Sequence, residues 1–395
     1  MPDYRVPMSS PDLGEAERRA VAKVLDTPIL SMGEQARAFE RAVCAVSGAA
    51  HALAVSSGTA GLHLCVRAAG IGPGDVVLTT PYSFIASSNV LLYENALPVF
   101  IDVDLRTGNL DPTRLEQAVR QLNAGGKAAK AWLPRHGAAV KKPKAILAVD
   151  VFGQPADYDA INGIAQQYDL LVIEDSCESL GSRYKDRLTG RLGQMGVYAF
   201  YPNKQMTTGE GGVVITDDAK AADFMRALRN QGRAEGDTWL QHTHLGYNYR
   251  LPELSAALGL AQLDRLEEML SKREQVAAWY GQRLQRVDGI EVQFIAPSTT
   301  RMSWFVYVVR LAPDLDRDRL VNLLDEAGIP TRPYFAPIHL QPFMMERFGY
   351  QAGDFPITEE LGRRSLALPF SSVMTAEQVE LVCAELETAL ARASI

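Results

Sequence analysis

The sequence predicts an α/β protein, in which a mostly parallel β-sheet covered by helices forms the larger part and a small α+β domain follows. Two observations predict this class. From about residue 48 to 217, short apolar runs alternate with helix-like segments, a pattern typical of parallel sheets. Beyond a long helical stretch, short strand-like and helix-like segments recur up to the C-terminus. The 395 residues, 47% of them apolar, can form two domains. We place them at 1–260 and 261–395, with the boundary between 260 and 285.

Seven apolar runs are the strand candidates of the larger domain. They are Ala52 to Val55, Val76 to Thr79, Pro98 to Asp102, Ile146 to Val151, Leu170 to Glu174, Val197 to Tyr201 and Val213 to Thr216. Ligands of such sheets collect at the carboxyl ends of the strands. We therefore expect the chemistry to lie at these ends.

The second part of the chain begins with a helical pattern. Apolar residues at helical spacing between 252 and 287 predict one or two long amphipathic helices, with Pro252 in a first turn. The small domain is then expected to contain strands at Ile290 to Phe294 and Phe305 to Leu311, and helices at Asp316 to Ala327 and Ala376 to Leu390.

The composition argues against several classes of partner. A net charge of -7 disfavours broad nucleic-acid binding. The four cysteines lack metal-ligand spacing, so we expect reduced thiols, no disulfide and no zinc site. Neither an apolar stretch of membrane-spanning length nor a signal-peptide pattern is apparent, which predicts a cytoplasmic protein. The basic residues between Lys127 and Lys144 are interspersed with Ala, Gly and Pro, so a solvated loop is expected there.

Lys204 is the most informative single residue. It lies between the strand candidates that end at Tyr201 and begin at Val213, so its position is expected to be structured and partly buried. A lysine withdrawn from water becomes the neutral amine that forms a Schiff base with a carbonyl. An ordinary surface lysine is the alternative, and the neighbouring strand ends decide between the two.

Three other strand ends carry groups that suit pyridoxal phosphate. Asp175 follows a buried strand and could face the ring nitrogen, which keeps the ring protonated as an electron sink. The turn from Ser56 to Gly61 opens a helix, and a helix N-terminus favours a phosphate. Tyr82 or Phe84 could stack on the ring. The alternatives are helix capping for Asp175 and for the turn, and a place in the core for Phe84.

The chain resembles the sugar aminotransferases of the DegT/DnrJ/EryC1/StrS family, which have the aspartate-aminotransferase-type fold of pyridoxal phosphate enzymes (fold type I). The likeness covers almost the whole chain. It is carried by Ser57-Gly58-Thr59-Ala60, Gly70-Ile71-Gly72-Pro73-Gly74-Asp75, Pro98-Val99-Phe100-Ile101-Asp102-Val103-Asp104, Phe152-Gly153-Gln154-Pro155, Glu174-Asp175, Asn203-Lys204, Thr207-Thr208-Gly209-Glu210-Gly211-Gly212 and Leu245-Gly246-Tyr247-Asn248-Tyr249-Arg250.

The resemblance implies a role for each matching residue. Lys204 would form the internal aldimine, and Asp175 would pair with the pyridinium nitrogen. Phe84 would stack on the ring. Asn248 would reach the phosphate of the neighbouring subunit's cofactor, so a homodimer with shared active sites is implied. The residues expected to hold the phosphate are Gly58, Thr59 and Ala60.

Three features depart from the family pattern. Ala199 stands where a phosphate-contacting serine is common, so Asn203 or a water would have to replace that ligand. Glu178 stands where Gln or His is usual, beside the phenolic oxygen of the cofactor, and must be protonated or paired with a cation. The stretch from about Leu122 to Pro143 is longer than is usual, and a surface loop is expected.

The implied function is transfer of an amino group from glutamate or glutamine, by way of pyridoxamine phosphate, to a keto sugar. The sugar would be a nucleotide-linked 3-keto or 4-keto sugar used in cell-surface polysaccharide or secondary-metabolite biosynthesis. Arginines that could bind its diphosphate are Arg229, Arg250 and Arg332, with ordinary ion pairs as the alternative. His339 could line the sugar pocket or be a structural histidine.

Three alternatives remain. A pyridoxamine-dependent nucleotide-sugar 3-dehydratase resembles this chain but has His where Lys204 stands, so lysine favours amino transfer. A keto-cyclitol aminotransferase is possible within the same family. A non-catalytic sugar-nucleotide sensor would be expected to lack the lysine or to carry a DNA-binding segment.

Overall fold

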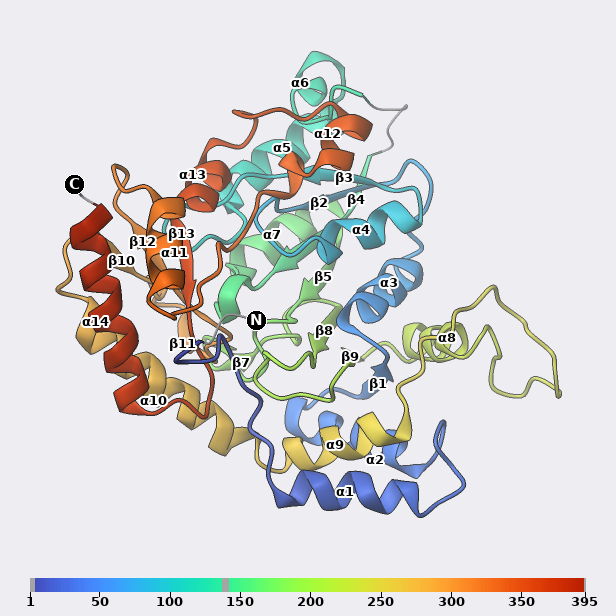
Figure 1. Cartoon of the computed structure of the whole chain (residues 1–395). Coiled ribbons are helices and arrows are strands. Elements are labelled where there is room, and N and C mark those ends of the chain that lie inside the picture. Colours follow the sequence, from blue (N-terminus) through green and yellow to red (C-terminus); the bar gives the residue numbers. More distant parts are fainter. Residues whose placement is uncertain (1–3, 137–141, 394–395) are drawn as a thin grey trace.

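The computed structural model describes residues 4–136 and 142–393. It contains a large α/β part and a smaller α+β part that lie side by side (Figure 1). The large sheet has seven strands in the order β1-β9-β8-β5-β4-β2-β3. Its strands are β1 (His51–Val55), β2 (Val76–Thr79), β3 (Leu97–Phe100), β4 (Pro143–Val149), β5 (Leu171–Asp175), β8 (Met195–Ala199) and β9 (Gly212–Thr216).

The predicted α/β class is confirmed, and the seven strand candidates of the large domain correspond to these strands with small shifts at their ends. The pairs that join β3, β2, β4, β5 and β8 are all parallel. β9 is antiparallel to both β1 and β8, and Ala199 faces Gly212 across the β8-β9 pair. The carboxyl ends of β5 and β8 therefore meet at one edge, next to the turn that joins β8 to β9.

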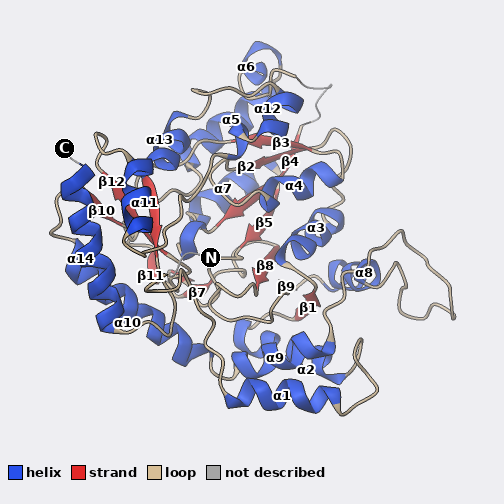
Figure 2. Cartoon of the chain, in the orientation of Figure 1, coloured by secondary structure: helices blue, strands red, loops and turns tan. Residues whose placement is uncertain are grey.

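Helices cover both faces of the sheet (Figure 2). Alternate strand residues pack in opposite directions, as the pleat requires. In β4, Leu147 packs in the core shared with α3, α4 and α8, whereas Ile146 packs in the core shared with α5 and α7. These helices are α3 (Gly58–Ala68), α4 (Ala86–Tyr93), α5 (Pro112–Ala124), α7 (Tyr158–Tyr168) and α8 (Ala219–Arg229).

The second sheet is antiparallel. Its strand order is β10-β12-β13, and helices α10, α11 and α14 flank it. A third, of β11, β6 and β7, joins the two parts. The strands are β6 (Arg183–Tyr184), β7 (Arg187–Leu188), β10 (Ile290–Val292), β11 (Thr299–Arg301), β12 (Tyr307–Leu311) and β13 (Ser365–Leu368). The remaining helices are α1 (Glu15–Leu25), α2 (Glu34–Ser47), α6 (Gly126–Lys130), α9 (Glu253–Leu263), α10 (Leu266–Leu284), α11 (Arg317–Glu326), α12 (Pro342–Phe348), α13 (Pro356–Arg364) and α14 (Ala376–Ala393).

The boundary proposed between the two parts stays a prediction in its exact position. The core of the smaller part includes Val276, on α10, and also Val6 near the start of the chain. The backbone N–H of Arg5 donates to the carbonyl of Gly328. The prediction assigned the first residues to the large domain, 1–260. Those that the structure describes pack with the small domain instead.

The surface loop expected from about Leu122 to Pro143 is confirmed only in part: residues 131–136 are irregular and Lys127, Lys130 and Arg135 are exposed, but part of the stretch is helical. α5 continues to Ala124 and α6 follows, with Leu122 and Ala129 buried in the core beside the large sheet. Residues 137–141 of this stretch lie outside the described residues. Lys144, the last of the basic residues, is the second residue of β4 and pairs with Asp75 at 3.1 Å. A few apolar side chains thus hold this segment against the core while Lys127 and Lys130 stay exposed.

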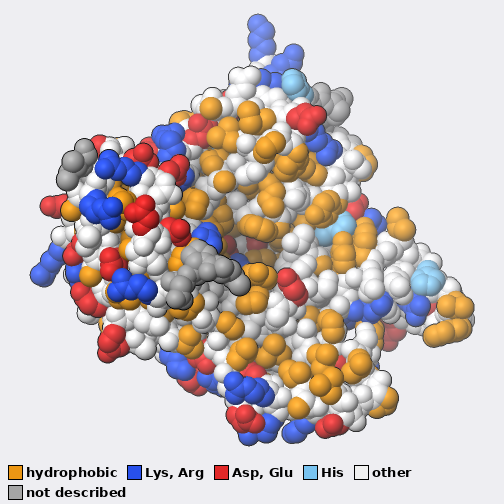
Figure 3. Space-filling view, viewed as in Figure 1, with side chains coloured by type: hydrophobic (Ala, Val, Ile, Leu, Met, Phe, Trp, Pro, Cys, Tyr) orange, Lys and Arg blue, Asp and Glu red, His pale blue; other side chains and the backbone are white. Residues whose placement is uncertain are grey.

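The four cysteines are free, and Cys65 and Cys383 are buried. No helix within 4–136 and 142–393 has the length and apolar content needed to cross a membrane. Basic and acidic side chains are interspersed over the visible face of the described residues (Figure 3).

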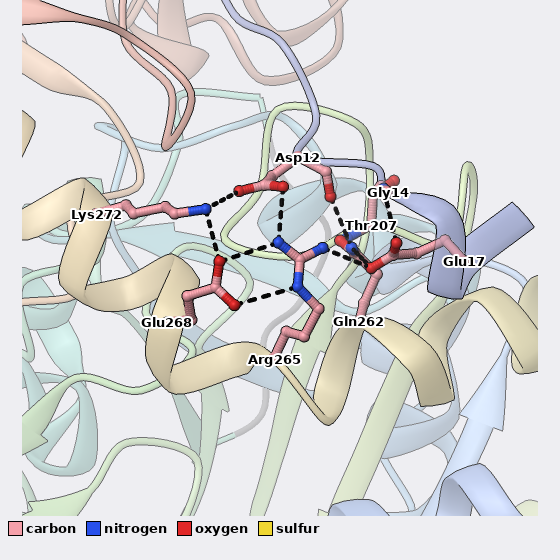
Figure 4. Close-up of polar contacts among 8 residues, drawn as sticks. All are labelled: Asp12, Gly14, Glu17, Thr207, Gln262, Arg265, Glu268 and Lys272. Atoms are coloured by element: carbon pink, nitrogen blue, oxygen red, sulfur yellow. Dashed lines mark hydrogen bonds and ion pairs between the residues drawn. The ribbon is translucent and has the colours of Figure 1, made fainter.

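A polar network ties the start of the chain to the junction of α9 and α10 (Figure 4). Arg265 bonds Glu17 at 2.9 Å and Asp12 at 3.0 Å. The Gln262 amide donates to Glu17 and to the Asp12 carbonyl, and its oxygen accepts the N–H of Thr207. The network therefore also reaches the segment that follows Lys204.

Glu17 contributes stability that depends on pH. Burial alone would raise the pKa of this carboxyl, but the hydrogen bonds from Gln262, Gly14 and Arg265 outweigh it and lower the pKa below its ordinary 4.5. A depressed carboxyl pKa stabilises the fold above the unfolded value, and this stability is lost as the pH falls through the folded value.

We predict that Glu17→Gln lowers the free energy of unfolding at pH 7 by about 1–2 kcal/mol, because charge-assisted hydrogen bonds are lost. The deficit should shrink as the pH falls below 4.5, as measured by urea denaturation. The exposed Glu15, in the same helical turn, is the control: Glu15→Gln should change little at either pH. Equal losses in the two variants would contradict the assignment.

Candidate active site

A cavity of about 760 Å³ lies at the carboxyl ends of β4, β5 and β8. Val149, Asp175 and Ala199, which end these strands, line it. The start of α3 and the turn after β8 supply further walls, and residues 333–336, 338 and 341 come from the smaller part. The site thus lies where the rule for parallel sheets places ligands.

Lys204 projects its amine into this cavity. Its side chain is 13% exposed, and Nζ lies 3.6 Å from Oε1 of Glu178. The amine also lies 3.8 Å from the centroid of the Phe305 ring. The backbone N–H of Lys204 donates to the carbonyl of Tyr201, which closes a tight turn after β8. The amine is therefore held at a defined place with little access to water.

Asp175 is the last residue of β5 and is buried. Its Oδ2 accepts a hydrogen bond of 2.6 Å from the Ser87 hydroxyl, at the start of α4. Its Oδ1 accepts a bond of 3.3 Å from the backbone N–H of Cys177. Asp175 caps no helix through its side chain, and the carboxylate faces the cavity.

Glu178 is the second acidic residue of the cavity. Its Oε2 accepts the backbone N–H of Phe152 at 2.9 Å, and Oε1 faces Lys204. Burial raises the pKa of Glu178, and the Lys204 amine opposes this rise. The Lys204 amine thus favours the ionised form of this carboxyl, and the place of Glu178 beside the cofactor oxygen stays a prediction.

The first turn of α3 opens on the cavity. Ser57 is the N-cap, and its hydroxyl accepts the N–H of Ala60 at 3.1 Å. Ser57, Gly58 and Thr59 line the cavity, whereas Ala60 is buried behind them. A Cβ on Gly58 would lie 2.7 Å from the Cβ of Ala199. Glycine is therefore required here by packing, and Ala199 closes the space beside it.

Asn203 lines the same cavity, and its buried Oδ1 has no hydrogen-bond partner among the described residues. Because this oxygen only accepts hydrogen bonds, it is the amide nitrogen of Asn203 that would have to bind the phosphate in place of the serine, and this role stays a prediction. Phe84 also lines the cavity and is 63% exposed. It does not belong to the core, and its stacking role stays a prediction.

The remaining predicted residues do not line this cavity. Arg229 bonds Glu40 and the carbonyl of Ala54. Arg250 bonds Asn230 at 3.1 Å, and Asn248 is bridged to the same residue through the backbone. Arg332 is exposed. His339 is fully buried and bonds Glu359 at 3.0 Å. For Arg229 and His339 these contacts favour the structural interpretation.

Arg273 is a buried residue that sequence reasoning missed. It is 2% exposed, and burial lowers the pKa of its guanidinium to about 10. One of its terminal nitrogens donates to the carbonyl of Lys204 at 2.6 Å. The other donates to the carbonyl of Phe305 at 3.2 Å. Arg273 thus fixes the backbone of Lys204 and that of Phe305, whose ring lies beside the Lys204 amine. The signal was its place on the apolar face of α10, between Leu270 and Val276.

The model of the DegT/DnrJ/EryC1/StrS aminotransferase family matches residues 11–387. The chain belongs to this family. GDP-perosamine synthase of Caulobacter vibrioides is 36% identical over 390 residues, 98% of each protein. EpsN of Bacillus subtilis, whose name describes a pyridoxal phosphate-dependent aminotransferase, is 32% identical over 95% of this chain and 93% of its own. The crystal structure of a family aminotransferase from Brucella abortus superposes with a TM-score of 0.84 at 29% identity, covering 94% of this chain and 95% of that one.

The enzyme is therefore an aminotransferase, and pyridoxal 5'-phosphate is its cofactor. The residues present fit this group. The N-terminus of the 11-residue helix α3 can hold the phosphate, Asp175 can accept a hydrogen bond from the protonated ring nitrogen and so keep it protonated, and Lys204 supplies the amine. When bound, the cofactor supplies an electron sink for chemistry at the α-carbon of an amine.

We predict that Glu178→Gln lowers the pH at which the visible absorbance of the bound cofactor titrates, by about one unit. A carboxylate close to the Lys204 nitrogen favours the protonated nitrogen, and the amide removes that charge. Spectrophotometric titration of the holoenzyme checks this. An unchanged midpoint would mean that Glu178 does not sense the lysine.

We also predict that Arg273→Met lowers kcat at least about tenfold with a smaller change in KM, and shifts the same absorbance titration, because the lysine turn loses its anchor. Arg273→Lys should restore part of the activity. Arg283→Met is the control, since Arg283 lies on the surface of α10 and bonds Glu380 and Glu387. A loss of stability without any shift of the titration would leave Arg273 a structural residue only.

Proposed function

We propose that this enzyme transfers an amino group from glutamate or glutamine to a keto sugar, in nucleotide-linked form. The observation that carries the proposal is the Lys204 amine, held 3.6 Å from Glu178 in a cavity that Asp175 also lines. The similarity to GDP-perosamine synthase over nearly the full length of both chains supports the sugar class.

Lys204 would carry out the proton transfers. A free amine at this place can accept the α-proton of the donor and return it to the other reacting carbon, as general base and then as general acid. Lysine at this position also favours amino transfer over the 3-dehydratase reaction, for which histidine is expected. The substrate diphosphate would be bound by cations at the rim, and Arg250 and Arg332 remain the proposed residues.

We further propose a homodimer with shared active sites. Asn248 does not line the cavity of its own subunit. The loop after α8 projects from the body of the molecule (Figure 1) and exposes Trp239, Leu240 and Leu245 by 82%, 64% and 80%. Large apolar side chains on a projecting loop favour burial against a partner. A second copy of the chain would bring Asn248 to the neighbouring cofactor.

The test is amine transfer from glutamate and from glutamine to a panel of 3-keto and 4-keto nucleotide sugars and one keto-cyclitol. We expect an aminated nucleotide sugar from the wild type, and neither product nor visible cofactor absorbance in Lys204→Ala. Loss of a hydroxyl without gain of nitrogen would indicate the dehydratase, and amination of the cyclitol alone would overturn the nucleotide-sugar assignment.

Shared sites are tested by mixing Lys204→Ala with Asn248→Ala subunits. Each inactive parent supplies the residue that the other lacks, so a mixed dimer regains one intact site. Recovery of activity on mixing supports the dimer with shared sites. If the two variants exchange subunits and activity still does not recover, the proposal is contradicted.

A further inference from the structure

A second cavity, of about 470 Å³, lies where α5 and the segment 130–135 meet residues 350–355. None of its lining residues lines the active-site cavity. α5, α6 and α12 gather beside the edge strand β3 (Figure 1). The segment from α6 onward belongs to the stretch between Leu122 and Pro143, none of whose described residues lines the active-site cavity.

The acidic groups of this second cavity are already engaged. The Oδ1 atom of Asp102 accepts the backbone N–H and the hydroxyl of Thr358, and Oδ2 accepts the N–H of Ile357 at the start of α13. Both oxygens of Asp354 accept hydrogen bonds from Arg135, at 2.6 and 2.7 Å. The Arg135 guanidinium lowers the pKa of Asp354. These carboxylates are thus satisfied within the protein and leave little capacity for a cation.

The polar groups that remain are hydrogen-bond donors. Lys130 lines the cavity without an ion pair among the described residues, and Arg114 only approaches Asp111, at 3.8 Å. The Gln121 oxygen accepts the Trp132 indole N–H at 2.7 Å, which leaves its amide nitrogen free to donate. The hydroxyl of Tyr350, a residue only 5% exposed, has no hydrogen-bond partner within the part of the chain that the structure describes. A buried hydroxyl without a partner costs free energy that a ligand would recover.

The other wall is aromatic. Phe100, Tyr350 and Phe355 line the cavity with ring centroids 5.4 to 6.0 Å apart. Trp132 lines it as well, and its hydrogen bond to Gln121 fixes the indole. Ring faces beside cationic donors suit a ligand that is flat at one end and anionic at the other.

We propose that this cavity is a second binding site, for a small anionic ligand that bears a flat ring, of the nucleoside diphosphate class. Lys130 and Arg114 bind the anionic end, and Trp132 packs against the ring. The site can also influence catalysis, because the Phe355 ring packs on His339 at 4.7 Å. His339 follows Ile338, which lines the active-site cavity. A ligand beside Phe355 is therefore connected, through His339, to the segment that shapes the substrate pocket.

The experiment is calorimetric titration of the pyridoxal phosphate-loaded enzyme with GDP, UDP and inorganic pyrophosphate. We compare the wild type with Arg114→Ala/Lys130→Ala and with the matched control Arg120→Ala/Lys127→Ala. The control cations are exposed on the same two helices but do not line the cavity. We expect a binding event at least about tenfold weaker in the first variant and unchanged in the control, since the loss of even one charged hydrogen bond corresponds to about tenfold in affinity.

Nucleotide binding at the active site would appear as a separate event that both double variants keep, so the two proposals can fail independently. Trp132→Leu should weaken the nucleotides but not pyrophosphate. The proposal is overturned if no probe binds outside the active site, if both double variants behave alike, or if pyrophosphate binds as tightly as the nucleotides.

Discussion

The active site depends on keeping one amine and two carboxylates together in a cavity with little water. Unpaired charges are costly to bury, so each needs a compensating group. Lys204 and Glu178 compensate each other across 3.6 Å. Asp175 is stabilised by the Ser87 hydroxyl and a backbone N–H. Since these groups come from β5, α4 and the turn after β8, the charges are matched only where the folded sheet brings these elements together.

The need to pair buried polar groups also explains why Arg273 is buried. The turn that carries Lys204 leaves backbone carbonyls pointing into the protein, and each needs a donor. A guanidinium offers five N–H groups in a fixed plane, so one side chain reaches the carbonyls of both Lys204 and Phe305. The small domain, which contributes Phe305, is thereby coupled to the lysine turn of the large domain.

Much of the fold could be predicted because buried parallel strands are continuous apolar runs, and all seven predicted strands of the large sheet lie close to their observed positions. Lys204, Asp175 and the turn at Ser57 were predictable because strand ends meet at one edge of the sheet. Arg273 was not predicted, because helical spacing shows which face is buried and not what the face contacts. Arg229 and His339 are residue types that could bind a substrate. In the fold, however, each bonds a glutamate from another segment, Glu40 and Glu359, and this pairing cannot be read from the sequence.

The antiparallel pairing of β9 with β8 has a consequence for how this enzyme could change. The lysine turn leaves the sheet at Ala199 and returns at Gly212, and these two residues face each other in register. Both ends of the turn are therefore fixed by backbone hydrogen bonds that do not depend on the side chains between them. Within this turn, Phe200 and Met206 pack in the core, whereas Tyr201, Asn203 and Lys204 line the cavity. Substitutions at the cavity-lining positions can therefore alter reactivity while the core and the register of the sheet are retained.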